Sequence, residues 1–300
     1  MKITETIATS AFREQMRSTR SEMVKYNDQI ATGKRVTKAS DDSMAFTSGK
    51  GFEDLIRRNE QYQLNASNGL FQARTSQQAL DDMQDVLISI KTLATSAAND
   101  NKNAGDRMDA AREVESMRDE LIGLANVQFN DLYLFGGTNS DVPPFTLDDT
   151  ELGGVADNSN ETALKVSVGE GSTIETSVSG VELREGATGN GDLFEVIEQT
   201  IRAMENNDGS EISNSIDKLA GNLDHIVNLS TKIANGVNRM EFANEKIDST
   251  LMDQNSELGR LTDADVVESM MNFQSAQTSY ETVLAVQSKM MQTSLLNFLR

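Results

Sequence analysis

The stretch ISNSIDKLAGNLDHIVNLSTKIANGVNRMEFANEKIDSTL, residues 212–251, decides the fold. Mostly apolar side chains recur through it at alternating steps of three and four residues, the spacing of a seam along one helix face. At about 1.5 Å per residue, the stretch predicts a helix roughly 60 Å long, which is a rod rather than an element of a globular core. The seam consists of Ile212, Ile216, Leu219, Leu223, Ile226, Ser230, Ile233, Val237, Met240, Asn244, Ile247 and Leu251.

Other parts of the chain carry the same spacing. A seam over residues 12–30 predicts a first helix, and Gly33 fits its end. Further patterns cover residues 52–94, from Phe52 and Leu55 onward, and residues 108–124, and NDNKNAG (99–105) predicts the turn between them. A shorter helix is expected over 192–206. The first seam consists of Phe12, Met16, Thr19, Met23, Tyr26 and Ile30.

The last helix needs a partner for its own seam. Thr262 and Asp265 resemble a capping box that opens it. Because the first and last helices each have a narrow seam and no long neighbour in sequence, we expect them to pair with each other. The last seam consists of Val266, Met270, Phe273, Gln277, Tyr280, Leu284, Gln287, Met291 and Phe298.

More apolar surface lies at the two ends than this pairing covers. Surplus apolar area at a chain end is typical of a contact with another subunit, or of a terminus that becomes ordered on assembly. Met271 and Met290 lie beside the seam and suit such contacts. The expected subunit-contact residues are Ile3, Ile7, Phe12, Met271, Met290, Leu295, Leu296, Phe298 and Leu299.

The middle of the chain changes in texture. Apolar and polar residues alternate over 164–168 and 174–178, with Gly169–Gly171 between them, which predicts two short strands and a turn. The predicted fold is therefore mainly α, a long antiparallel helical bundle or coiled-coil rod with paired termini and a small β-rich insertion. The predicted parts are 1–45 with 255–300 (paired terminal helices), 46–145 with 192–254 (rod) and 146–191 (insertion).

The stretch FNDLYLFGGTNSDVPPF, residues 129–145, holds four of the 15 aromatic residues and both prolines. We interpret it as a border, where a strand such as Leu132–Phe135 packs its rings on the rod, glycines allow a sharp turn and prolines stiffen the entry to the insertion. The predicted border residues are Tyr133, Leu134, Phe135, Gly136, Gly137, Pro143, Pro144 and Phe145.

Composition excludes several classes of function. The formal net charge of -20 argues against nucleic acid and anionic membranes as partners. Residues 1–38 nevertheless hold eight basic and four acidic side chains, a local charge of +4 that could attract an acidic neighbouring subunit, although a solvated helix face is the commoner interpretation. The chain has no cysteine, no apolar run of membrane-spanning length and no sign of a secretory signal.

The residues predict no catalytic, metal or cofactor site. His225 is the only histidine, so it lacks a second ligand or base and a structural role is expected. Asp41 and Asp42 are adjacent, and we expect Ser40 or Asp41 to cap the next helix. Gly136 and Gly137 have neither the spacing nor the helix of a dinucleotide-binding motif. An enzyme is therefore not expected.

With these elements in place, QIATGKRVTKASDD near the start and MMQTSLLNFLR at the end make the chain resemble the bacterial flagellin superfamily. The matching positions are Gly33, Arg35, Val36, Asp41, Asp42, Asp263, Ala264, Asp265, Gln274, Ser288, Ser294, Leu295 and Leu296. ANVQFNDLYLFGG (125–137) is similar to flagellins at Asn126, Phe129 and Asn130, whereas YLFGG followed by PPF resembles the hook-filament junction branch, hook-associated protein 3. Ala39 and Ser43 stand where that branch tends to have proline. Flagellins often have alanine at the position of Ala39, which keeps flagellin, the filament subunit, as the alternative.

The resemblance implies a structural protein that assembles with itself in a ring or helical lattice, contacts the preceding hook-associated protein and offers flagellin a lattice on which to grow. It also implies type III flagellar export without a cleaved signal peptide, an extracellular location and an export chaperone on the C-terminal helix. A third class, an adhesin or secreted effector, would require the β-rich insertion to bind a ligand.

Overall fold

The structure, a computed structural model, describes residues 2–148, 150–151, 153–186 and 191–298, and the side chains from residue 10 to residue 289 within them. Two compact units make up the chain: residues 1–58 with 250–300, here called the terminal unit, and residues 59–249, here called the central unit. Two long helices, α2 (Ser43–Ala97) and α6 (Gly209–Thr262), contribute residues to both units. The predicted mainly helical fold is confirmed.

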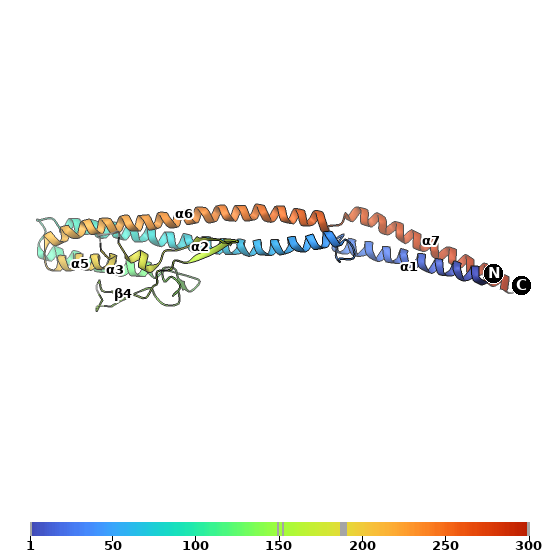
Figure 1. Cartoon of the computed structure of the whole chain (residues 1–300). Coiled ribbons are helices and arrows are strands. Elements are labelled where there is room, and N and C mark those ends of the chain that lie inside the picture. The colour runs from blue at the N-terminus through green and yellow to red at the C-terminus, as the bar shows by residue number, and fades with distance from the viewer. Residues whose placement is uncertain (1, 149, 152, 187–190, 299–300) are drawn as a thin grey trace. The chain divides into compact units, whose positions relative to one another are not determined.

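In the terminal unit, α1 (Lys2–Thr32) and α7 (Val266–Phe298) lie side by side and run in opposite directions (Figure 1). The start of α1 therefore lies beside the end of α7, as the two predicted seams require. The predicted pairing of the first and last helices is confirmed.

In the central unit, α2 and α6 pack antiparallel, as three contacts between their side chains fix the register. The amide of Gln63 donates to Asp248, Arg74 Nη2 lies 2.6 Å from Glu241 Oε1, and Ser230 Oγ donates to Asp81 Oδ1 over 2.6 Å. Two shorter helices, α3 (Ala104–Ala125) and α5 (Leu193–Glu205), pack on each other within the same unit. The predicted seam of α6 is confirmed, since Ile212, Ile226, Ile233 and Met240 are all buried.

The seam predicted along α2 is confirmed over most of its length. Ala66, Ala73, Leu80 and Leu87 are buried in one core with residues of α3, α5 and α6. Its start is wrong by one residue, because Ile56 is buried whereas Leu55 is exposed. A heptad pattern does not choose between adjacent apolar residues, and here only one of them points inward.

The sequence between α3 and α5 forms three two-stranded antiparallel ladders: β1 (Gln128–Phe129) with β2 (Leu132–Tyr133), β3 (Phe145–Leu147) with β4 (Val155–Asp157), and β5 (Lys165–Gly169) with β6 (Ser172–Glu175). The β5–β6 hairpin is the strand pair predicted from alternation, and Val166 pairs with Ile174. A short helix, α4 (Gly180–Arg184), follows it. Val155, Val178 and Leu183, which fall in the predicted insertion, belong to the same buried core as the long helices.

The predicted border stretch forms a compact turn system over the end of α3. Asn130 and Asp131 both have positive φ, as the tight β1–β2 hairpin requires. The strand predicted for Leu132–Phe135 ends at Tyr133, after which Leu134 and Phe135 are buried. Gly137 has φ +67, and an added Cβ would lie 2.7 Å from Thr162 O, so this position admits only glycine.

Phe145 completes the border. Its backbone is held by the side chain of Asn126, which accepts from Phe145 N over 3.0 Å and donates to Phe145 O over 2.7 Å. Its ring lies 5.3 Å from that of Phe194, tilted by 51°. The carbonyls of Pro143 and Pro144 both accept hydrogen bonds from Asn158. The stretch therefore links the helical core to the strands.

Candidate assembly site

Two loops that are about 230 residues apart in sequence meet where the terminal helices begin and end. Lys34 and Asp263 form an isolated antiparallel bridge. Thr262 O accepts from Arg35 N over 2.7 Å and from Val36 N over 3.2 Å, while Gly33 O accepts from Ala264 N over 2.9 Å. These residues, 33–36 and 261–264, are here called the double loop. It brings together five of the positions that carry the resemblance: Gly33, Arg35 and Val36 from the front, and Asp263 and Ala264 from the back.

Side chains reinforce the double loop. Lys34 Nζ lies 2.5 Å from Asp263 Oδ1, and Arg35 Nη2 donates to Leu261 O over 2.9 Å. Both members of the ion pair are about half exposed, so the pair contributes little, about 0–1 kcal/mol. Val36 is buried and supplies the apolar anchor. The backbone hydrogen bonds and Val36 therefore matter more here than the charges.

Asp41 and Asp42 serve different turns. Asp41 Oδ2 accepts from the backbone amides of Thr37 and Lys38, and these hydrogen bonds lower its pKa. Asp42 Oδ1 accepts from Ala45 N over 3.0 Å, which lowers its pKa, with a smaller contribution from Arg35. The expected cap at Ser40 or Asp41 is wrong: the cap of α2 is Asp42, because only its carboxylate reaches the amide of the first helical turn.

The capping box predicted for α7 is also wrong in its first member. Thr262 is the last residue of α6, and its hydroxyl donates to Leu258 O within that helix. Asp265 caps α7 alone, and its Oδ1 accepts from Val267 N over 2.9 Å and from Glu268 N over 3.0 Å. The spacing of Thr262 and Asp265 fits a capping box, but a helix that ends at Thr262 occupies the first position.

The contact between α1 and α7 uses small and polar residues. In α1 the predicted seam is confirmed in phase, since Phe12, Met16, Met23 and Tyr26 are half-buried, and Thr19 is buried. In α7 the buried positions are Ser269 and Ala276, with Phe273, Tyr280 and Gln287 half-buried. Ser269 Oγ lies 3.4 Å from Gln29 Oε1 across the pair.

The other predicted seam positions of α7 are wrong where side chains are described, and the side chains of Met291 and Phe298 lie outside the described ones. Small side chains at 269 and 276 let the two backbones approach closely, so at these two positions the buried residue is the one before the predicted seam residue, and Met270 and Gln277 are exposed. The predicted seam residues that are exposed instead are Val266, Met270, Gln277 and Leu284.

An apolar surface is therefore left uncovered on the terminal unit. Val267 and Met271 on α7 are exposed by 67% and 61%. Large exposed apolar patches of this kind mark contacts with other proteins. We call this the terminal apolar surface; its members are Val24, Met44, Leu55, Met252, Val266, Val267, Met270, Met271, Leu284 and Val286.

The predicted contact residues fall in three groups. Met271 lies on the terminal apolar surface, and Phe12 is half-buried between the helices. Leu299 lies outside the described residues, and the same holds for the side chains of Ile3, Ile7, Met290, Leu295, Leu296 and Phe298. The small seam residues Ser269 and Ala276 were not predicted, although their spacing of seven is the signal that would have found them.

In the described part of the chain, the polar residues singled out from the sequence, such as His225, form no catalytic arrangement. A ring nitrogen, Nε2, of His225 lies 2.8 Å from Glu182 O, which ties α6 to α4. Within the described residues, no group of three or more histidine or acidic side chains could hold a metal ion. In that same part of the chain, no helix is long and apolar enough to cross a membrane.

Sequence reasoning also missed a charged cluster that holds the β5–β6 hairpin. Lys232 of α6 lies 3.2 Å from Glu175 and 2.8 Å from Glu182, and Lys165 lies 3.1 Å from Glu175 across the hairpin. Burial raises the pKa of Glu175, but the two lysines together lower it below its ordinary value. Lys165 and Glu175 lie opposite each other in the predicted hairpin, but Lys232 comes from α6, 50 residues after Glu182, so no local pattern could have found the whole cluster.

Two known protein families match the double loop and the helices that it joins. The family described as "Bacterial flagellin N-terminal helical region" matches residues 3–140, and the family described as "Bacterial flagellin C-terminal helical region" matches residues 215–299. The chain belongs to the flagellin superfamily. Both matched regions contribute to the terminal unit and to the α2–α6 pair, and the unmatched middle contains β3 to β6, α4, α5 and the start of α6.

Relatives agree with this assignment over most of the chain. The flagellar hook-associated protein 3 of Salmonella typhimurium is 23% identical over 296 residues, covering 90% of this chain and 92% of its own. Flagellin FlaB1 of Treponema pallidum is 25% identical over 281 residues, covering 91% of each. A solved flagellar hook-associated protein from Vibrio parahaemolyticus, 21% identical, covers 74% of this chain and all of its own with a TM-score of 0.67, which supports the fold. The homologues are structural proteins of the bacterial flagellum.

Proposed function

We propose that the chain is the structural junction between the hook and the filament of a bacterial flagellum, where it gives flagellin a lattice to grow on. The observation that carries this proposal is the terminal unit, in which paired helices joined by the double loop leave the large apolar side chains of the terminal apolar surface exposed. A protein that makes permanent contacts with copies and neighbours needs exposed apolar side chains for those contacts. A non-enzymatic role is part of the proposal.

The terminal apolar surface supplies the contacts. Val267 and Met271, exposed on α7, are proposed to lie against neighbouring subunits in a ring or helical lattice. The predicted contact residues at the ends of α1 and α7, including Ile3, Ile7, Leu295 and Leu296, extend the same role. The preceding hook-associated protein would lie on one side of this lattice and flagellin on the other, in keeping with the resemblance to junction proteins.

Export follows from the same proposal. The chain would leave the cell unfolded through the flagellar type III system, and a chaperone would hold the C-terminal helix beforehand. This proposal is supported by the small number of buried apolar side chains in that helix: among its described side chains, α7 contributes one, Ala276. A helix with so little core of its own is easily held in an extended or partner-bound state before assembly.

Deletion of the gene tests the function. Cells without the chain should make hooks that bear no filaments, while flagellin accumulates in the medium. Re-expression of the chain should restore filaments, which controls for effects on neighbouring genes. Normal filaments in the deletion strain would contradict the proposal.

Flagellin itself is the second candidate, favoured by Ala39 and by the match to a flagellin over nine-tenths of the chain. The same deletion separates the two, because loss of the filament subunit would leave no flagellin in the medium. The PPF turn at residues 143–145, which has the junction branch's pattern, favours the junction.

A further inference from the structure

The two units place their methionines differently. Among the described side chains, four methionines are more than half exposed, and all of them belong to the terminal unit: Met44 (80%), Met252 (76%), Met270 (54%) and Met271 (61%). We call these four the exposed methionines. The methionines of the central unit are all buried or half-buried, and they are Met83, Met108, Met117, Met204 and Met240. The central unit therefore keeps methionine sulfur away from solvent, whereas the terminal unit presents it.

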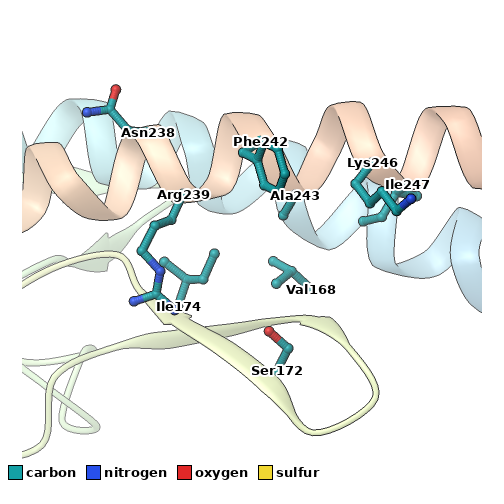
Figure 2. Close-up of a pocket in the computed structure, with 9 residues that line it drawn as sticks. All are labelled: Val168, Ser172, Ile174, Asn238, Arg239, Phe242, Ala243, Lys246 and Ile247. Atoms are coloured by element: carbon teal, nitrogen blue, oxygen red, sulfur yellow. The ribbon is translucent and has the colours of Figure 1, made fainter.

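The large apolar side chains that the central unit does expose, as far as it is described, contain no sulfur. Phe242, for example, borders a groove between α6 and the β5–β6 hairpin, and none of the described residues that line this groove is methionine (Figure 2). The exposed large apolar residues of the central unit are Leu64, Phe71, Ile88, Leu132, Val142, Leu147, Val227 and Phe242. Exposed methionine is thus confined to the terminal apolar surface, for which the proposed function requires contacts.

Methionine sulfur is the group of this chain that an oxidant attacks most readily, because the sequence has neither cysteine nor tryptophan. In the reaction with a peroxide, a lone pair of the sulfur forms a bond to one peroxide oxygen while the O–O bond breaks. With hydrogen peroxide the second oxygen leaves as water, so the thioether is oxidised to a sulfoxide and the peroxide is reduced. Since the oxidant must reach the sulfur, the exposed methionines should react before the buried ones.

Oxidation changes what these side chains can do in a contact. A thioether is apolar and flexible, so it fills irregular gaps against a neighbouring protein. A sulfoxide carries a strongly polar oxygen, and burying such an oxygen without a hydrogen-bond partner is costly. We propose that the exposed methionines are an oxidation site for peroxides, and that their oxidation prevents a chain that is not yet assembled from entering the assembly.

This inference rests on the proposed function, because it needs the terminal apolar surface to be covered in the assembly. It adds a form of regulation to that surface. In the chain before assembly the four sulfur atoms are accessible, so an oxidant converts the surface into a polar one. In the assembled chain the same atoms are covered by neighbouring subunits and are protected. Oxidised chains are therefore rejected, while chains already in place remain intact.

Mapping of the oxidised positions is the first measurement. The purified chain and isolated flagella are treated with hydrogen peroxide, and mass spectrometry of peptides measures the gain of one oxygen at each methionine. In the purified chain, the exposed methionines should react at least about tenfold faster than Met83, Met204 and Met240, which are fully buried. In flagella their reaction should be slowed by at least about tenfold relative to the purified chain. Equal rates at exposed and buried methionines of the purified chain would overturn the site.

Binding to hooks is the second measurement. Cells that lack the gene are incubated with purified chain, untreated or oxidised, and the chain retained on their isolated hooks is measured by immunoblotting. Oxidation of the wild-type chain should lower the retained amount at least about tenfold.

Two variants make the binding test specific. A chain in which all four exposed methionines are changed to leucine keeps apolar side chains of similar volume, and should bind equally with and without peroxide treatment. The matched control carries Met108→Leu and Met117→Leu in the central unit, keeps the exposed methionines, and should lose binding on oxidation as the wild type does. Far-ultraviolet circular dichroism checks the folding of each variant before and after treatment.

The outcomes separate this inference from the function on which it rests. If the untreated chain does not bind to hooks, the proposed function fails, and this inference fails with it. If the untreated and the oxidised chains bind equally, the function stands and the proposed effect of oxidation is overturned. If the variant with four leucines loses binding on peroxide treatment as the wild type does, the damage lies elsewhere and the assignment to the exposed methionines is overturned.

Discussion

The central unit removes Phe135, Phe145 and Phe194 from water, whereas the largest buried apolar side chains described in the terminal unit are Ile56 and Val36. The two units are built from the same kind of helix, and α2 and α6 contribute to both. The two units differ in which elements cover the inner faces of their helices. The central unit has α3, α5 and the strands to cover its helices, while α1 and α7 have mainly each other.

This difference assigns different roles to the two units. A helix gains most of its stability from tertiary packing, so the central unit holds its fold with its own core. The terminal unit exposes Val267, Met270 and Met271 and buries small residues instead. Stability of the terminal unit therefore depends on what covers it, in keeping with the proposed function, in which this segment is exported and then packed into a lattice.

The largest effect should come from the core of the central unit. Phe194→Ala removes a fully buried ring that packs on Phe145, and we expect a loss of about 3–5 kcal/mol in the free energy of unfolding. Urea denaturation followed by circular dichroism measures it. Met271→Ala, the matched change on the terminal apolar surface, should alter monomer stability by less than about 0.5 kcal/mol. A large effect of Met271→Ala would show that α7 is already packed in the monomer.

Hydrogen exchange compares the two units within one molecule. Amides in the half-exposed part of α7 around Thr278 and Thr282 should exchange on the order of a hundredfold faster in a dilute monomer than those of α6 around Ile226 and Ile233. The reason is that opening α7 exposes little apolar area. Mass spectrometry of peptides resolves the two regions. Equal protection in both would contradict the proposed dependence of the terminal unit on assembly.

The same difference explains how much could be predicted from the sequence. Where a seam is strongly apolar, as in α6, periodicity predicted the buried face correctly, because burial of large apolar residues dominates the energy. In α7, Ser269 and Ala276 are buried whereas Val266 and Met270 are exposed, because close approach of two backbones favours small residues. The Gly33–Val36 contact with Thr262–Ala264 was beyond prediction from periodicity, since it depends on backbone hydrogen bonds between distant loops.

Gly33 is the first residue of the double loop, which joins the helices of the terminal unit. Its φ of +66 is a left-handed conformation, and an added Cβ would meet nothing within 4 Å, so Gly33→Ala should introduce conformational strain alone, about 1–2 kcal/mol. Gly51 is the matched control: it is helical, its Cβ position is also open, and Gly51→Ala should stabilise α2 by about 0.5–1 kcal/mol. Exchange of the α1 amides should become faster in the first variant and not in the second. Unchanged exchange in Gly33→Ala would mean that the double loop does not hold α1.

The smallest effect concerns pH at the start of α2. The Ala45 amide lowers the pKa of Asp42 in the folded chain, so this interaction is fully present above the ordinary value of about 3.9 and is lost as the pH falls through the lower folded value. Asp42→Ala should therefore speed exchange of the Ala45 amide roughly fivefold near neutral pH. Wild type and variant should converge at a pH below the folded pKa. Asp54→Ala, which removes an exposed carboxylate that pairs only with Arg57 one turn later, should show no such pH-dependent difference at Ala45. A difference between wild type and Asp42→Ala that persists at the lowest pH would mean that the side chain acts through something other than its charge.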